Sequence, residues 1–409
     1  MELKKDLVIF SYTSIWALVR AFPSIFENGT TTKYFNNLTV CGRESSREEA
    51  IQRLDKDISE IRGQERGENK RVLQSQQNLR DRLNSGRVGY FNFITNGTIN
   101  LPDGYYDAAI FTKNTIHHKC IEVLLKHGNI NIICEKPLVV LTDETHKADD
   151  KELEGLEGLV KQYGDGLVLI DAEHYSAKEA TIAFYDNLEL MSSKYGQIKD
   201  IESRTLEKDD SLSIRTQNLL CIKNRTGLLL DMGVHLFGII TNIKGEVHKI
   251  EGATYDKYQG YNVETHAEVE FKLRGDYFTE DAKGRIKMTK FIDKLKEQKD
   301  EQKVQDEKKF IVTFFDKQTK KETTVTLDFR KGTAISSDGE EFKPKMLVSP
   351  NEYDSIFKEF YECIAIKRKD PTKGNPRTCF DNSIRTLRTI YEIYKQFPVE
   401  KNLLEVYRR

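Results

Sequence analysis

The sequence lacks the marks of a secreted, disulfide-bonded or membrane protein. Its six cysteines include no close pair and no Cys-x-x-Cys, so neither a disulfide framework nor a zinc knuckle is expected, and no metal site is predicted. The first apolar run is only a few residues long, too short for a signal peptide core or a bilayer span. These absences predict a cytoplasmic protein with no membrane partner.

The sequence also lacks an excess of charge of either sign. Its 64 Lys and Arg residues are balanced by 65 Asp and Glu residues. No broad basic field can therefore attract a phosphate backbone, which argues against nucleic acid as the main ligand. The 409 residues, of which 38% are hydrophobic, are more than one core usually serves, so two domains are expected.

Two kinds of hydrophobic pattern predict the fold class. Short apolar segments alternate with helical stretches in the first part of the chain, which is typical of a doubly wound parallel sheet. Between residues 245 and 345, apolar and polar residues alternate, which favours an antiparallel sheet with one wet face. We predict an α/β domain over residues 1–150 and an α+β domain with a large, mostly antiparallel sheet over residues 151–409. The charged run at 283–309 is predicted to be a solvated helical insertion.

A lysine follows one of the predicted buried strands in the motif Cys134-Glu135-Lys136-Pro137-Leu138. Ligands of open parallel sheets collect beyond the carboxyl ends of the strands, so Lys136, held by the following proline, is expected to face a ligand. It could donate a proton or a hydrogen bond to a reacting hydroxyl. The alternative is an ordinary surface lysine at a strand end.

An acid and a histidine occur together within an apolar segment. Asp231 and His235 are four residues apart, so they share one face of a helix. A carboxylate and an imidazole among leucines cost free energy unless they are paired or used. Histidine is the side chain best matched to accepting a proton near neutral pH. The alternative is a core histidine with satisfied hydrogen bonds.

A third cluster of polar side chains follows the predicted strand that ends at Ile170. His174, Tyr175 and Lys178 offer hydrogen-bond donors within one turn of one another, which suits an anionic or polyhydroxylated ligand. The alternative is a helix start with solvated charges.

Taken together, these motifs resemble the glucose-fructose oxidoreductase and inositol dehydrogenase (Gfo/Idh/MocA) family. The matching pieces are residues 112–117, 135–137 and 231–235, in the family's order. The resemblance implies a Rossmann-type dinucleotide-binding domain followed by an α/β domain with a large sheet. It also implies that His235 removes a hydroxyl proton, Asp231 orients or charges the imidazole, and Lys136 stabilises the alkoxide, while a nicotinamide accepts hydride.

The N-terminal half also resembles glucose-6-phosphate dehydrogenase. This likeness rests on three segments: the opening strand and turn at 8–14, the Phe-Pro pair at 22–23, and residues 173–179. The last of these is similar to the motif Asp-His-Tyr-x-x-Lys-Glu. It implies that His174 and Lys178 bind a phosphate on the sugar. The predicted substrate-binding residues are Lys136, His174, Tyr175 and Lys178.

The first turn departs from both families, which place glycines there so that the pyrophosphate can approach a helix N-terminus. This chain has Ser11, Tyr12, Thr13 and Ser14 instead. Side chains there could obstruct the usual approach of the cofactor, although small hydroxyls could also donate hydrogen bonds to phosphate. Arg43 replaces the usual acidic residue after the second strand and favours NADP, with NAD possible. The predicted cofactor-binding residues are Ser11, Thr13, Ser14, Ile15, Arg43, Thr112, Asn114, His117 and Glu135.

The sequence therefore predicts an NAD(P)-dependent oxidoreductase that acts on a secondary hydroxyl of a sugar or sugar phosphate. The alternative is a non-catalytic binding or regulatory protein with the same fold, which the altered first turn motivates. By analogy with the flat sheet face of relatives, a homodimer or homotetramer is expected.

Overall fold

The computed structural model describes most of the chain as two compact units. The described residues are 5–14, 17–26, 34–62, 68–143, 145, 147–207, 227–256, 263–290, 307–370, 373 and 376–397. The first unit comprises residues 1–138, 155–172 and 349–380, and the second comprises residues 139–154, 173–348 and 381–409. Each unit is interrupted in sequence, whereas a single boundary at residue 150 is expected from the sequence.

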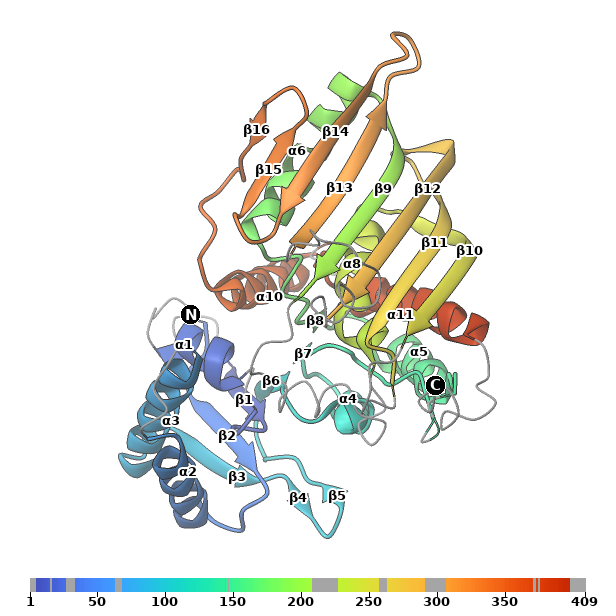
Figure 1. The fold of residues 1–409 in the computed structure, drawn as a ribbon. Coiled ribbons are helices and arrows are strands. Elements are labelled where there is room, and N and C mark those ends of the chain that lie inside the picture. The colour runs from blue at the N-terminus through green and yellow to red at the C-terminus, as the bar shows by residue number, and fades with distance from the viewer. Residues whose placement is uncertain are drawn as a thin grey trace. The chain divides into compact units, whose positions relative to one another are not determined.

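The described part of the first unit contains a parallel sheet with strand order β3-β2-β1-β6-β7-β8 (Figure 1). The strands are β1 (Asp6–Phe10), β2 (Leu38–Gly42), β3 (Gly89–Asn92), β6 (Tyr106–Ile110), β7 (Ile132–Cys134) and β8 (Leu169–Asp171). All neighbouring pairs are parallel, and the sheet extends in both directions from β1, as a doubly wound sheet does. The prediction of a Rossmann-type sheet is confirmed.

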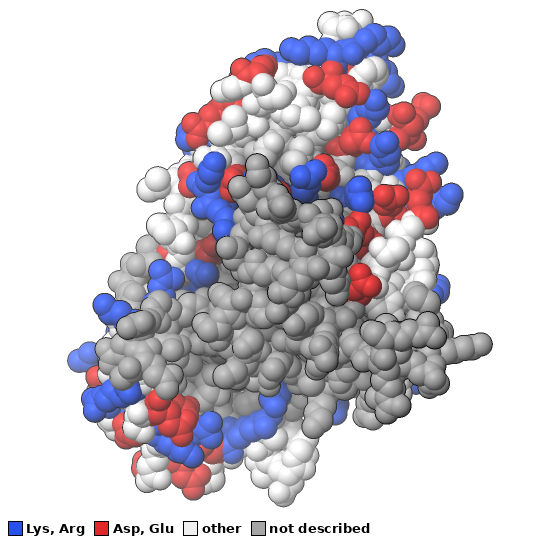
Figure 2. Space-filling view, in the orientation of Figure 1, with Lys and Arg blue, Asp and Glu red and all other residues white. Residues whose placement is uncertain are grey.

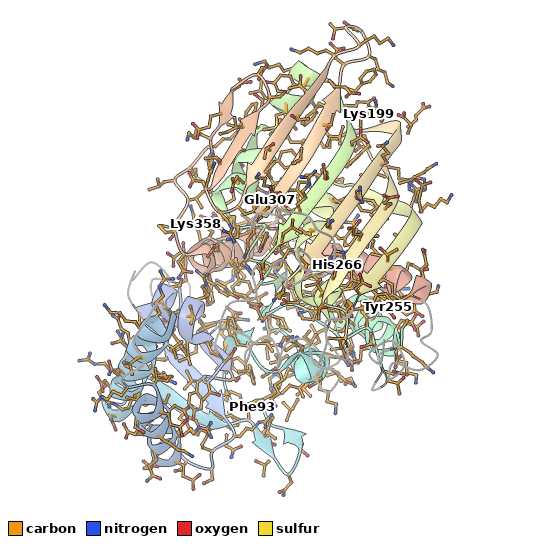
Figure 3. The ribbon with its side chains drawn as sticks, viewed as in Figure 1. Phe93, Lys199, Tyr255, His266, Glu307 and Lys358 are labelled. Carbon is orange, nitrogen blue, oxygen red and sulfur yellow. The ribbon has the colours of Figure 1, made fainter. Side chains whose placement is uncertain are left out.

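The central strands of this sheet are apolar because both faces are covered. Leu7, Ile9 and Phe10 of β1 are fully buried, and Phe93, labelled in Figure 3, meets the ring of Phe10 edge-on with centroids 5.6 Å apart. The helices described in or next to this unit are η1 (Ala17–Ala21), α1 (Phe22–Phe26), α2 (Arg47–Ile61), α3 (Glu68–Asn84), α4 (Asn114–His127), α5 (Lys151–Tyr163) and α10 (Glu352–Lys369). A small hairpin, β4 (Ile94–Thr95) and β5 (Thr98–Ile99), follows β3.

The second unit contains a sheet with strand order β10-β11-β12-β9-β13-β14-β15-β16 in its described part. Its strands are β9 (Gln197–Leu206), β10 (Glu246–Asp256), β11 (His266–Arg274), β12 (Phe278–Thr289), β13 (Glu307–Phe315), β14 (Glu322–Asp328), β15 (Thr333–Ser336) and β16 (Glu341–Phe342). Among these strands β9 and β12 pair parallel, and the other neighbours pair antiparallel. The predicted mostly antiparallel sheet is confirmed. Its helices are α6 (Glu179–Tyr195), η3 (Leu229–Gly233), α8 (Val234–Asn242) and α11 (Phe380–Gln396).

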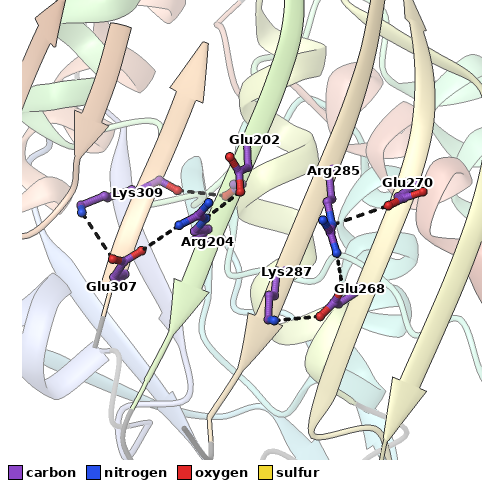
Figure 4. Close-up of polar contacts among 9 residues, drawn as sticks. Glu202, Arg204, Glu268, Glu270, Arg285, Lys287, Glu307 and Lys309 are labelled. Carbon is purple, nitrogen blue, oxygen red and sulfur yellow. Dashed lines mark hydrogen bonds and ion pairs between the residues drawn. The ribbon is translucent and has the colours of Figure 1, made fainter. Parts of the chain in front are cut away.

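One face of this sheet carries charged side chains that pair across neighbouring strands (Figure 4). Arg285 of β12 contacts Glu268 at 2.7 Å and Glu270 at 3.6 Å, both on β11. Arg204 of β9 contacts Glu307 of β13 at 4.0 Å and Glu202 of its own strand at 2.6 Å. Alternating charges on a wet face are stabilised by such cross-strand partners.

This pairing corrects the prediction of a helical insertion at 283–309. Strand β12 continues to Thr289 and strand β13 begins at Glu307, while residues 291–306 lie outside the described residues. The prediction of a helix was wrong for a physical reason. Gly284, Ile286 and Met288 are small or apolar and face inward, but the lysines and the arginine that alternate with them dominate the composition of this segment.

The described surface carries both signs of charge. Figure 2 shows Lys and Arg interspersed with Asp and Glu across the coloured part of this view, as the near-zero net charge implies. None of the helices within the described ranges is long and apolar enough to cross a membrane.

Candidate active site

His235 is held by a carboxylate in the second unit. It is the second residue of α8, which continues the π-type turn η3, and only 4% of its surface is exposed. Its Nδ1 makes a short hydrogen bond with Oε1 of Glu173. Because a carboxylate accepts hydrogen bonds, we infer that the proton sits on Nδ1, which makes Nε2 the basic nitrogen of the ring.

Glu173 is itself fixed by its neighbours in the chain. Its Oε1 accepts a hydrogen bond from the Tyr175 amide at 2.9 Å, and its Oε2 accepts from the amide and hydroxyl of Ser176 at 2.7 and 2.5 Å. The residue is buried. A carboxylate held by several donors has one orientation, so it also gives the imidazole one orientation.

Three of the four predicted substrate-binding residues, namely His174, Tyr175 and Lys178, lie close to this pair. The ring of Tyr175 stacks on His235 with centroids 4.5 Å apart, and the ring of His174 meets His235 edge-on at 4.4 Å. Lys178 Nζ lies 5.1 Å from the centre of the Tyr175 ring. Burial, with nearby Glu207 and Glu173, raises the pKa of Tyr175, so its hydroxyl stays protonated at neutral pH. His174, Tyr175 and Lys178 are therefore near His235, as their assignment to one site requires.

Asp231 has a partner that was not expected from the sequence. Its carboxylate forms an ion pair with Lys290, which follows β12, and a second ion pair joins Glu207 to Lys308. Burial disfavours the charged form of Lys290, but the charges of Asp231 and Glu207 outweigh it and raise the pKa of the lysine. Asp231 is expected from the sequence to orient the imidazole, whereas the carboxylate found on Nδ1 belongs to Glu173.

The roles of Glu173 and Lys290 were thus missed at the level of sequence. Glu173 is the first residue of the motif at 173–179, where it stands in place of an aspartate while the rest of the motif matches. This position could have marked Glu173 as a candidate site residue. Lys290 lies in the run at 283–309 that composition made look solvated, so its sequence carried no comparable signal.

In the first unit, Lys136 and Glu135 follow β7 as expected, and both are buried. Glu135 accepts a short hydrogen bond from the hydroxyl of Tyr353, a residue of α10. The Lys136–Pro137 peptide bond is cis.

His117 of α4 connects the two turns that carry the other predicted cofactor residues. Its Nδ1 lies 2.8 Å from the carbonyl oxygen of Pro137, and its Nε2 lies 3.0 Å from that of Thr112. Burial lowers the pKa of this imidazole, which favours its neutral form. Since both ring nitrogens face backbone oxygens, His117 positions Thr112 and Pro137 more directly than it could contact a ligand.

The first turn lies at the carboxyl end of β1. Ser11 has φ of +76°, a left-handed conformation that glycine would adopt more easily. Thr13 is exposed and Ser14 half-buried, whereas Ile15 lies outside the described residues. Arg43 is exposed after β2, and Asn114 begins α4 after Thr112. The predicted cofactor residues that are described thus lie at the carboxyl ends of β1, β2, β6 and β7, where a dinucleotide binds to such a sheet.

The adenosine side of this region fits a dinucleotide poorly, because the ring of Tyr12 lies against Gly42. Only 1% of the surface of Tyr12 is exposed.

Glu173, His174 and His235 are the described residues whose geometry could also suit a metal ion, since one ligand atom of each lies within 4.8 Å of the others. The oxygens of Glu173, however, already accept hydrogen bonds from Tyr175, Ser176 and His235. The arrangement suits an oriented imidazole better than a metal centre.

Solved structures with the same fold are numerous. A UDP-N-acetylglucosamine 3-dehydrogenase from Acidithiobacillus ferrooxidans aligns with a TM-score of 0.59 and 11% identity over 96% of this chain and 97% of the other. An oxidoreductase domain protein from Kribbella flavida aligns with a TM-score of 0.64 and 12% identity over the same shares. A levoglucosan dehydrogenase in complex with NADH and levoglucosan aligns with a TM-score of 0.60 and 14% identity over 96% of each chain.

The chain has the two-part fold of these oxidoreductases. No family model and no curated protein sequence matches it. At such low identity the likeness establishes the fold, not the activity. The resemblance to glucose-6-phosphate dehydrogenase, and the phosphate site that it implies, stays a prediction.

Proposed function

We propose that the chain is an NAD(P)-dependent oxidoreductase that acts on a secondary hydroxyl of a sugar or sugar phosphate. The observation that carries this proposal is the buried pair of Glu173 and His235, in which Nδ1 faces the carboxylate. Such a pair creates a base at Nε2, which a merely structural histidine does not need. The fold shared with sugar dehydrogenases supports the same conclusion.

In this proposal His235 Nε2 takes the proton of the substrate hydroxyl, and Glu173 stabilises the imidazolium that forms. A nicotinamide, when bound, supplies the hydride acceptor. Lys136 keeps its predicted role of stabilising the alkoxide. Asp231 acts through its ion pair with Lys290, which fixes the turn that leads into α8.

The substrate class rests on the groups around His235. Lys178 can donate a charged hydrogen bond to a phosphate and His174 can donate a further hydrogen bond, while Tyr175 offers a flat ring against which a sugar face can pack. A nicotinamide nucleotide is the proposed cofactor; the preference for NADP that Arg43 predicts would need this arginine to pair with a ribose 2′-phosphate, which the ring of Tyr12 on Gly42 disfavours. A homodimer or homotetramer and a cytoplasmic location remain predictions.

The test is turnover of NADP or NAD by the purified chain with a panel of sugars and sugar phosphates. His235→Ala should abolish it, whereas His248→Ala, at an exposed histidine of β10, should retain it. If the unaltered chain binds no nicotinamide nucleotide, the proposal fails and the non-catalytic alternative takes its place.

A further inference from the structure

Three side chains converge on the last residue of β2. A β carbon added to Gly42 would overlap Tyr12 Cε1, Glu44 Oε2 and the hydroxyl oxygen of Tyr90. Tyr12 follows β1, Tyr90 belongs to β3, and these strands flank β2 in the sheet. Only glycine at position 42 leaves room for this cluster.

A ring contact and hydrogen bonds to Glu44 hold the cluster in place. The rings of Tyr12 and Tyr90 meet edge-on with centroids 6.1 Å apart. The Tyr90 hydroxyl donates to the backbone oxygen of Glu44 at 2.8 Å and lies 3.2 Å from its Oε2. That same Oε2 accepts the Arg43 amide at 3.1 Å.

The first turn directs Tyr12 inward. The left-handed conformation of Ser11, whose amide donates to the carbonyl of Cys41 at 3.0 Å, turns the chain over the end of β2. Burial raises the pKa of Tyr12, and the charge of Glu44 adds to the effect, so the hydroxyl stays neutral in this cluster.

The position of this cluster matters because of what a doubly wound sheet binds there. The adenosine ribose of a dinucleotide lies at the carboxyl end of the second strand, next to an acidic residue, and the bare first turn admits the pyrophosphate. In this chain the buried ring of Tyr12 packs directly against Gly42 at that strand end.

We propose that Tyr12 determines how this chain recognises its nicotinamide ligand, by filling the place of the adenosine ribose. The inference rests on the proposed function and concerns the same cofactor. While the ring lies on Gly42, the adenosine half of the ligand gains few contacts, and recognition depends on the nicotinamide half. The chain therefore discriminates little between a full dinucleotide and reduced nicotinamide mononucleotide.

The experiment is a fluorescence titration of the full chain with NADPH, NADH and reduced nicotinamide mononucleotide. For the unaltered chain we expect the three dissociation constants to agree within about threefold. Tyr12→Ala should tighten binding of both dinucleotides by about tenfold or more and leave the mononucleotide unchanged. Tyr12→Phe, which keeps the ring, should behave like the unaltered chain.

Two results would overturn the inference in different ways. Binding of NADH or NADPH about tenfold or more tighter than the mononucleotide by the unaltered chain contradicts the role of Tyr12 but leaves the proposed function intact. This comparison needs no variant, so it holds even if Tyr12→Ala does not fold. Absence of binding of all three ligands, by the unaltered chain and by a folded Tyr12→Ala, contradicts the proposed function and the inference with it.

Discussion

Glu173 binds the Nδ1 of His235 across 62 residues of sequence, and both side chains are buried. The carboxylate thereby selects the ring tautomer and stabilises a positive charge on the ring. This relationship makes the roles of the neighbouring residues testable one at a time.

Glu173→Gln should lower kcat by about 10²- to 10⁴-fold with little change in KM, because an amide removes the negative charge that stabilises the imidazolium. The pH dependence of kcat should also change, which loss of packing alone would not cause. Glu270→Gln, on the wet face of β11, is the matched control and should leave kcat unchanged. An unaltered kcat and pH profile for Glu173→Gln would remove His235 from the role of base.

Lys178→Ala should raise the KM for a sugar phosphate by about tenfold or more, the loss expected for a hydrogen bond to a charged group. The KM for the unphosphorylated parent sugar should change much less. Lys199→Ala, at a half-buried residue of β9, serves as control. Equal effects of Lys178→Ala on both substrates would exclude phosphate recognition by this lysine.

Lys290→Met should destabilise the fold by about 3 kcal/mol, since it leaves the carboxylate of Asp231 without its cation in a largely buried place. The double variant Lys290→Met, Asp231→Leu should recover most of this loss, because it removes both charges. Urea unfolding of the three proteins measures the effect. Similar stability of the single variant and the unaltered chain would show that the ion pair contributes nothing.

The same pair predicts a dependence of stability on alkaline pH. The pKa of Lys290 is raised in the folded chain, so the pair stabilises the fold fully below the unfolded pKa of about 10.4. This stabilisation is lost as pH rises through the folded pKa. The free-energy difference between the unaltered chain and the double variant should therefore change above that pH and stay constant from pH 7 to about 9. A difference that is constant throughout would contradict the assignment.

Gly42→Ala should destabilise the first unit by about 1–3 kcal/mol, the usual cost of overfilling a packed site, because the added methyl group overlaps Tyr12, Glu44 and Tyr90. Gly252→Ala in β10, where no atom lies within 4 Å of the added carbon, is the control. Adding Tyr12→Ala to Gly42→Ala should restore part of the stability. Thermal unfolding measures all of these, and equal midpoints for Gly42→Ala and Gly252→Ala would contradict the packing described here.

Local pattern was enough to predict several strands of each sheet, although most of β12 was predicted to be helical. The apolar run at Leu7, Val8 and Ile9 and the alternation at 267–273 each reflect which faces of a strand are buried, and this information is present in a few consecutive residues. The motifs around Lys136, His174 and His235 likewise pointed to candidate groups, because their chemistry is unusual beside apolar segments.

Only the tertiary structure decided which groups act on one another. Packing between segments far apart in the chain determines that Glu173, not Asp231, binds Nδ1 of His235 and that Asp231 pairs with Lys290. The same kind of packing places residues 349–380 in the first unit. The cluster on Gly42 is of the same kind, since three neighbouring strands bring its members together. The sequence determined the elements through local periodicity, and the folded chain determined the partners through distances that periodicity does not encode.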